Sequence, residues 1–198
     1  MTFEEALNIL KQTSPLKITV SGDLGAGKST FAKHLSEELE VPRIYAGGLL
    51  REKAAERGMT LAELGASMEN DKELDLWVDS VTTKRSEELE RGIFEGRTAW
   101  HFVKNPTARL FFSVDDRIAA ERIWGDKNNP NRDKYTSIEH VIEANNARRT
   151  SEIKRYKQYY DIDVYDHKNF DIIIDTSKIS LEDVYKQAII ALAEHIQS

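Results

Sequence analysis

Apolar residues follow two spacings along this chain, and segments with one spacing alternate with segments of the other. Short continuous runs rich in branched and aromatic residues are typical of buried strands. Such runs occur at residues 16–21, 41–45, 92–97, 108–114 and 170–175. Between them, apolar residues recur every three or four positions, as on one face of a helix. The predicted helices cover residues 3–12, 31–39, 47–57, 61–64, 73–90, 116–124, 137–160 and 181–196.

Strands that alternate with helices belong to right-handed βαβ units, whose strands run parallel. We therefore expect an α/β fold of three layers, with a mostly parallel five-stranded sheet and helices on both of its faces. A chain of 198 residues has the length of one domain with a full core. No internal repeat, low-complexity tract or linker divides it.

Two predicted helices begin with the spacing of a capping box. In this motif a threonine and a glutamate three residues later satisfy exposed N–H groups of the first turn. Thr2 with Glu5 and Thr60 with Glu63 have this spacing. We therefore expect helices to begin at the residues that follow the two threonines.

Two segments allow a prediction of which residues are buried. Leu74, Val78 and Val81 form an apolar stripe on one predicted helix, with Trp77 beside it, and we expect this stripe to face the core. The run at residues 170–175 contains three consecutive isoleucines and is predicted to be a buried strand.

Composition and charge exclude several classes of protein. The net charge of −6 argues against a nucleic-acid polymer as a partner held by general electrostatics. The chain has no cysteine, which removes disulfides, thiolate catalysis and cysteine-based zinc sites. No apolar run approaches the ~20 residues of a membrane span, and the first residues are acidic where a signal peptide is basic. We expect a cytoplasmic protein with no membrane partner.

The segment after the first predicted strand is the most informative in the chain. It matches the phosphate-binding pattern G-x-x-x-x-G-K-[ST] and reads Gly22-Asp23-Leu24-Gly25-Ala26-Gly27-Lys28-Ser29-Thr30. Its glycines let backbone N–H groups point inward and form a cradle for nucleotide phosphates. Lys28 would place its charge at the β- and γ-phosphates, and Ser29 would offer a hydroxyl to Mg²⁺. Strand, loop and helix occur in the required order, which predicts a P-loop NTPase-type fold rather than a glycine-rich turn with an unrelated lysine.

Other candidate residues also follow predicted strands. Gly47 comes after the second strand, and Asp115 comes after the fourth. Glu95, Gly96 and Arg97 end the third strand. Ligands of parallel sheets bind outside the carboxyl ends of the strands. We therefore expect these residues to lie along one edge of the sheet, together with the phosphate loop.

Six segments, in sequence order, make this chain similar to a known family. They are the phosphate loop and residues 46–51, 57–61, 95–97, 148–156 and 170–177. Over about residues 16–195 they resemble the short, archaeal-type cytidylate kinases, within the P-loop nucleoside monophosphate kinases. The resemblance implies transfer of the γ-phosphoryl group of ATP to a nucleoside monophosphate, with CMP or dCMP as the expected acceptor.

The resemblance also implies that the single domain of residues 1–198 has three regions. The core would cover about 15–45, 91–122 and 168–198, the monophosphate-binding region about 46–90, and a mobile lid about 123–156. The sequence gives no indication of the oligomeric state.

The resemblance assigns several arginines to phosphate groups. Arg51 and Arg97 match positions that hold the acceptor phosphate, and a guanidinium suits bidentate phosphate binding. Arg148 and Arg155 are seven residues apart with Glu152 between them, so the three share one helix face. The family places arginines with this spacing at the transferred phosphoryl group. The alternative for all four is an ordinary solvated surface.

Further residues are assigned to the acceptor, to Mg²⁺ or to ATP. Glu95 would hold waters on Mg²⁺ or orient Arg97, and Asp115 is the weaker candidate for the same role. Arg122 would stack on the adenine of ATP, or lie on its helix without a ligand. The other residues expected beside the acceptor are Gly47, Gly96 and Arg149.

Two departures from the family pattern lie near the expected acceptor base. Gly48 stands where these kinases commonly carry an aspartate, and residues 98–102 follow the pattern only in part. An adenylate kinase or another small-molecule kinase is therefore the nearest alternative. Glu69, Asp71 and Asp75 are available to accept a hydrogen bond from the amine of cytosine.

A nucleotide-dependent binding switch is a more distant alternative. A GTPase would need an N-K-x-D motif to read its base, and this chain has none. A kinase consumes ATP only with its acceptor, which separates the two classes.

Overall fold

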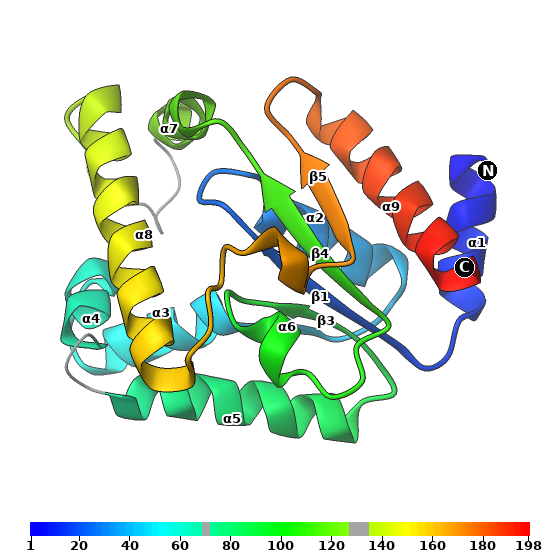
Figure 1. Ribbon diagram of the computed structural model, residues 1–198, viewed down its shortest axis with the longest axis horizontal. Helices are drawn as coiled ribbons and strands as arrows, with labels where there is room; N and C mark the ends of the chain where they lie inside the picture. The colour runs from blue at the N-terminus through cyan, green and yellow to red at the C-terminus, as the bar shows by residue number, and fades with distance from the viewer. Residues whose placement is uncertain (69–71, 127–134) are drawn as a thin grey trace.

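Five strands form one sheet in the middle of the molecule, in the order β2-β3-β1-β4-β5 (Figure 1). The computed structural model describes residues 1–68, 72–126 and 135–198. The strands are β1 (Leu16–Gly22), β2 (Arg43–Tyr45), β3 (Arg91–Glu95), β4 (Ala108–Ser113) and β5 (Ile172–Asp175). All four pairings between neighbouring strands are parallel, which confirms the predicted sheet.

Helices alternate with the strands as predicted, with α1 before the first strand and α9 after the last. They are α1 (Phe3–Gln12), α2 (Lys28–Glu38), α3 (Ala46–Glu56), α4 (Leu61–Met68), α5 (Lys72–Glu88), α6 (Ala99–Phe102), α7 (Asp116–Gly125), α8 (Ile138–Tyr160) and α9 (Leu181–Gln197). Both capping boxes are present, at the starts of α1 and α4. The short α6 and the 3-10 turn His167–Asn169 were not predicted, because segments of three or four residues are too short to show a periodic pattern.

Helices cover both faces of the sheet. On one face, Phe31 of α2 and Ile189 of α9 join Ile18 of β1 in the main hydrophobic core. On the other face, Phe94 of β3 packs with Ala99 of α6. Figure 1 shows α1 and α9 side by side, so that the two ends of the chain lie close together.

The strand register brings the carboxyl ends of the central strands to one edge. Val20 of β1 pairs with Glu95 of β3 on one side and with Leu110 of β4 on the other. The phosphate loop leaves β1 two residues later, at Gly22. Glu95 and the phosphate loop therefore lie at the same edge, as predicted.

The buried face of α5 differs from the predicted one. Leu74 and Val78 are buried, but Val81 is half-buried and Trp77 is 37% exposed. The buried stripe continues instead through polar residues, namely Asp75, Asp79, Thr82 and Ser86. These side chains find partners in the fold; Asp79, for example, accepts a hydrogen bond from Thr98 at 2.7 Å. Apolar periodicity alone could not identify a buried face whose polar groups are satisfied by residues distant in sequence.

Smaller corrections concern the two edge strands. β2 begins at Arg43, two residues later than predicted, and has three residues. β5 is buried on one face only, and its Ile173 is 43% exposed.

Within the described ranges, no helix is long and apolar enough to cross a membrane. Glu69 and Asp71, named above as candidates for reading cytosine, lie outside the described residues, as do residues 127–134 of the predicted lid.

Candidate active site

A cavity of about 700 Å³ opens at the carboxyl edge of the sheet, between the phosphate loop, α3, α5 and α8. It brings together most of the residues that the sequence predicted to bind phosphate. Those that line it are Leu24, Gly25, Gly27, Lys28, Ser29, Thr30, Gly47, Arg51, Glu95, Gly96, Arg97, Arg148 and Arg155.

The phosphate loop depends on glycine at two positions where the chain passes close to other backbone. A Cβ at Gly22 would lie 2.3 Å from the Phe112 carbonyl oxygen, and one at Gly25 would lie 2.8 Å from the Ala119 carbonyl oxygen. Both glycines also have positive φ, of 147° and 78°. The loop then enters α2 at Lys28, so the N–H groups at this helix start are available to an anion.

Lys28 lies at the end of the loop, and no carboxylate among the described residues pairs with its ammonium group. Its Nζ donates to the carbonyl of Asp23 at 3.2 Å. Burial lowers the pKa of Lys28 to about 7, and the nearby charges of Arg97 and Arg148 act in the same direction. Lys28 is half-buried and lines the cavity. An anion in the cavity would restore the charge of Lys28.

Ser29 and Glu95 form an oxygen-rich corner beside Lys28. Ser29 Oγ donates to Glu95 Oε1 at 2.5 Å, and Arg43 Nε donates to Glu95 Oε2 at 3.0 Å. Glu95 is 3% exposed. Its partners in this structure are therefore Ser29 and Arg43, whereas Arg97 pairs with Glu152.

Arg97, Arg148 and Glu152 form a group that we call the charge cluster. Glu152 accepts a hydrogen bond from Arg97 Nε at 2.8 Å and another from Arg148 Nε at 2.9 Å. Burial alone would raise the pKa of Glu152, but the charges of both arginines and a hydrogen bond from Tyr165 hold it well below its usual range. Glu152 thus stays ionised and fixes two guanidinium groups at the cavity wall.

Two arginines of the cavity also carry buried donors that no described residue satisfies. These donors are Nη2 of Arg97 and Nε of Arg51. The other two nitrogens of the Arg97 guanidinium, Nε and Nη1, donate to Glu152 and to the Gly22 carbonyl. A buried N–H group without a partner costs free energy, so both donors are suited to an incoming anion.

Tyr45 explains the two glycines at the start of α3. Arg51 Nη1 donates to the Tyr45 hydroxyl at 2.5 Å, and the ring lies 4.4 Å from the Arg43 guanidinium. A Cβ at Gly48 would lie 2.8 Å from an atom of this ring, and one at Gly47 would lie 2.9 Å from another. The Tyr45 ring therefore occupies the space next to Gly48, which is the position where the family commonly has an aspartate.

The far end of the cavity is lined by acidic and aromatic side chains of α5 and α8. Arg155 Nε lies 2.8 Å from Asp75 Oδ2, and both residues are buried. Asp79 accepts hydrogen bonds from Tyr160 at 2.5 Å and from Thr98 at 2.7 Å. Burial raises the pKa of Asp79, although these two hydrogen bonds oppose the shift. Carboxylates and a guanidinium thus face the region opposite the phosphate loop.

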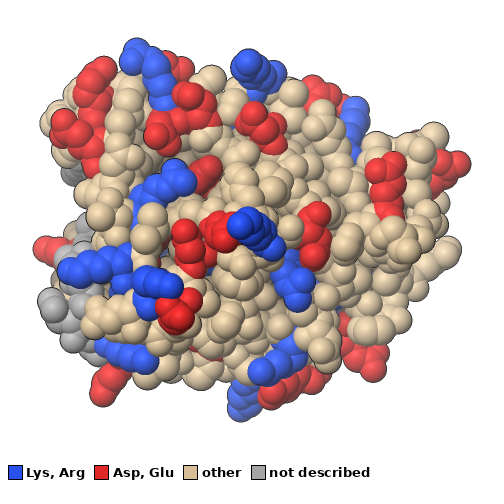
Figure 2. All heavy atoms as spheres, in the orientation of Figure 1, with Lys and Arg blue, Asp and Glu red and all other residues tan. Residues whose placement is uncertain are grey.

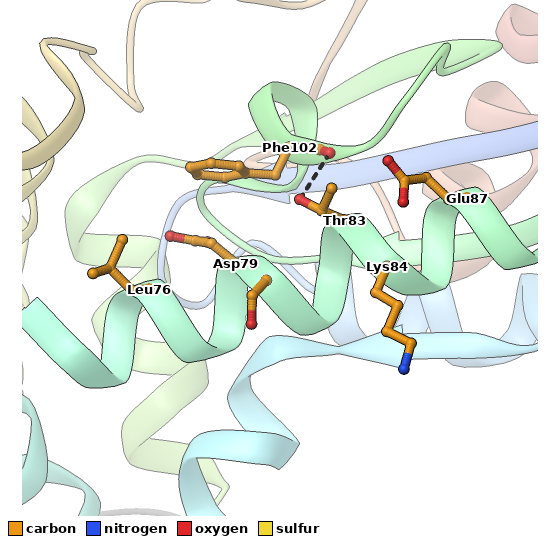
Figure 3. Close-up of a pocket in the computed structure, with 7 residues that line it drawn as sticks. Leu76, Asp79, Thr83, Lys84, Glu87 and Phe102 are labelled. Carbon is orange, nitrogen blue, oxygen red and sulfur yellow. Dashed lines mark hydrogen bonds between the residues drawn. The ribbon is translucent and has the colours of Figure 1, made fainter.

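Asp79 also lines a second, more open hollow of about 400 Å³ on α5 (Figure 3). Phe102 of α6 lies over this part of α5, and its carbonyl accepts a hydrogen bond from Thr83 at 3.3 Å. Among its described lining residues the one cation is Lys84, which lies with two carboxylates, whereas the large cavity is lined by the phosphate loop and four arginines.

Several predicted site residues lie outside the lining of the large cavity. Arg122 donates to the Thr176 side chain at 3.0 Å and to its carbonyl at 2.6 Å. Arg149 packs on Tyr165 and lies 3.8 Å from Asp23. Asp115 caps α7 and is exposed, and its role beside Mg²⁺ stays a prediction. The others outside the lining are Gly22, Asp23 and Ala26 of the phosphate loop.

Sequence reasoning did not assign Tyr45 and Asp79, which line the cavity, or Arg43 and Tyr165, which contact residues of its lining. None belongs to a motif that a single sequence displays. The four-residue spacing of Asp75 and Asp79 on one helix was the available signal, and it is weak because charged helix faces are common.

On the molecular surface, positive and negative side chains lie next to one another, including over α8 (Figure 2).

Comparison with known proteins identifies the relatives of this chain. The sequence model of the cytidylate kinase-like family matches residues 17–178. The chain belongs to this family. The cytidylate kinase of Methanocella arvoryzae is 39% identical over 161 residues, which are 81% of this chain and 87% of that protein. The cytidylate kinase of Methanocaldococcus jannaschii is 36% identical over 174 residues, which are 85% of this chain and 92% of that protein.

Membership of the cytidylate kinase-like family confirms the resemblance carried by the six segments. Solved structures share the fold as well. A shikimate kinase from Bacteroides thetaiotaomicron superposes with a TM-score of 0.60 over 92% of this chain and 99% of that chain, at 14% identity. At this identity the likeness shows the fold alone, and it confirms the predicted P-loop NTPase-type fold.

Proposed function

We propose that this member of the cytidylate kinase-like family transfers the γ-phosphoryl group of ATP to CMP or dCMP. The observation that carries the proposal is the pair of unsatisfied buried donors on Arg51 and Arg97, which line the same cavity as the phosphate loop. Phosphoryl transfer requires two nucleotides to be aligned and their charge to be stabilised. A cavity with cations on several sides is suited to both tasks.

The phosphate loop would hold ATP, with its N–H groups and Lys28 directed at the phosphates. Arg122 would lie beside the adenine. Ser29 and Glu95 supply the oxygen atoms that suit Mg²⁺, with Ser29 as the ligand and Glu95 holding waters of the ion. The ion held by these two residues would help to neutralise the negative charge that develops on the phosphates.

On the acceptor side, Arg51 and Arg97 would bind the phosphate of the monophosphate. Arg148 and Arg155 would stabilise the transferred group, with Glu152 orienting Arg148 and Arg97. Gly47 and Gly96 line the cavity and would lie beside the acceptor, whereas Arg149 would act at the rim of the site. None of these side chains needs to form a covalent intermediate.

The base of the acceptor would lie near Asp75 and Asp79. The exocyclic amine of cytosine is a donor that a carboxylate can accept, and its ring offers acceptors to a guanidinium such as Arg155. Adenylate kinase activity is the second candidate, because a carboxylate would also accept the amine of adenine.

We further propose that the three regions expected from the sequence act as core, monophosphate-binding region and lid. Arg148 would belong to the lid, and Arg51 to the monophosphate-binding region. A cytoplasmic location stays a prediction from composition and family.

A panel of acceptors tests the proposal. ADP release is measured with ATP, Mg²⁺ and one of CMP, dCMP, UMP, AMP, GMP or dTMP. We expect turnover with CMP and dCMP, and none without an acceptor. Preferred use of AMP would support the second candidate, and ATP consumption that ignores the acceptor would overturn the kinase proposal.

A further inference from the structure

Tyr165 belongs to the segment that joins α8 to β5 along the chain. It does not line the large cavity, but it contacts Glu152 and Arg97, which do. Its hydroxyl donates to Glu152 Oε2 at 2.6 Å. The same oxygen accepts the hydrogen bond from Arg97 Nε at 2.8 Å. Arg148 donates to the other oxygen, Oε1. The carboxylate of Glu152 thus accepts hydrogen bonds from three donors, which fix its orientation.

The ring of Tyr165 makes a second set of contacts. The Arg97 guanidinium lies 5.4 Å from the ring centroid, and the Arg149 guanidinium lies 4.5 Å from it. Both distances are within the range of cation–π attraction. Phe111 of β4 packs edge-on against the same ring at 6.4 Å, which ties its position to the sheet.

The phenol of Tyr165 remains a donor at every working pH. Burial raises its pKa above the usual range, and the charge of Glu152 adds to this shift against the opposing charge of Arg97. The geometry does not depend on this shift, because a neutral phenol is the ordinary state of tyrosine.

We propose that Tyr165 is a positioning residue for phosphoryl transfer, which holds Glu152 and Arg97 in the orientation that the two phosphates require. It acts through the charge cluster and touches neither nucleotide. The proposal rests on the proposed kinase function. It adds a residue outside the motifs by which the chain resembles its family.

The test compares Tyr165→Phe, which removes the hydroxyl and keeps the ring, with Tyr165→Leu, which removes both. Tyr185→Phe is the matched control, because the buried Tyr185 hydroxyl on α9 has no hydrogen-bond partner among the described residues. We expect Tyr165→Phe to lower kcat with CMP about tenfold, the typical effect of a lost hydrogen bond to a charged group. ATP affinity measured without acceptor should stay unchanged. Tyr165→Leu should lower kcat further, and Tyr185→Phe should behave as the wild type.

A double-mutant cycle with Glu152→Gln separates positioning from a general structural role. If Tyr165 acts through Glu152, adding Tyr165→Phe to Glu152→Gln should change kcat less than about twofold. Additive effects in the double variant would overturn the proposal, as would a wild-type kcat in Tyr165→Phe and Tyr165→Leu. Should Glu152→Gln fail to fold, the single variants decide alone. A wild type that transfers phosphate to no monophosphate would overturn the kinase function first, and this inference with it.

Discussion

The phosphate loop is one stretch of backbone, whereas the charge cluster joins side chains from two distant segments. In the loop, glycines at Gly22 and Gly25 let the chain pass within van der Waals contact of other backbone, and N–H groups are the binding atoms. In the cluster, Arg97 and Arg148 are separated by fifty residues of sequence and meet only at Glu152.

The difference determines how each region responds to substitution. A substitution in the phosphate loop removes only the function of the substituted side chain, because the backbone still holds the neighbouring binding groups in place. Loss of the buried Arg97 or Glu152 leaves the former partners with unpaired charge, so activity and stability change together, whereas water can replace the contact of the half-exposed Arg148. The four predictions below test this contrast, from the largest expected effect to the smallest.

Lys28→Ala should lower kcat about 10³-fold while the fold stays intact. Its charge would be directed at phosphates, and among the described residues its ammonium group donates only to the Asp23 carbonyl. Steady-state kinetics and a thermal melt measure the two quantities. Lys33→Ala, an exposed lysine of the same helix, is the control and should change neither. A turnover rate close to that of the wild type in a folded Lys28→Ala protein would contradict the assignment of the ATP site.

Arg97→Ala should raise the KM of the acceptor and lower kcat, with little change in ATP affinity measured without acceptor. Loss of one partner from a buried charge pair costs about 2–5 kcal/mol, which is at least about 30-fold in kcat/KM. The control is Arg85→Ala, an exposed arginine of α5.

The same variant also tests coupling within the cluster. Glu152 would keep one arginine instead of two, so the free energy of unfolding should fall as well. An unchanged acceptor KM combined with weaker ATP binding would contradict the assignment of Arg97 to the acceptor.

Arg148 and Arg155 share a helix face, but the structure predicts different effects for them. The Arg155 side chain is 8% exposed and pairs with buried Asp75, so Arg155→Ala should lower the free energy of unfolding by about 3–5 kcal/mol. The Arg148 side chain is 51% exposed, so Arg148→Ala should cost less than about 1 kcal/mol and act mainly on kcat. Urea titrations compare the two, with Arg117→Ala of an exposed pair on α7 as control. Equal losses of stability would contradict this distinction.

The smallest expected effect is a proton taken up when ATP binds. The pKa of Lys28 is lowered to about 7 in the free protein, so Lys28 is charged below that pH and increasingly neutral above it. Phosphates would raise this pKa again, so ATP binding should take up a proton and weaken as the pH rises from 7 to 9.

Calorimetry in two buffers of different ionisation enthalpy measures the number of protons taken up at pH 8. The proton uptake should be absent in Lys28→Ala. Equal binding heats in both buffers for the wild type would show that Lys28 is already fully charged before ATP binds.

Much of this protein could be read from its sequence because the relevant interactions are local. Strand runs, helix periodicity and capping boxes involve residues within a few positions of one another, and they predicted nearly all of the elements. The phosphate loop was predicted for the same reason, since one contiguous segment supplies its strand, turn, lysine and helix start. Even the face shared by Arg148, Glu152 and Arg155 follows from helix geometry alone.

Only the tertiary structure decided which charged groups are partners. Glu95 binds Ser29 and Arg43 rather than Arg97, and Arg97 binds Glu152. Such pairs depend on strand order and on where α8 crosses the sheet edge, which no local pattern encodes. The polar buried face of α5 is hidden for the same reason, because Asp79 becomes acceptable in the interior only once Thr98 and Tyr160 donate to it.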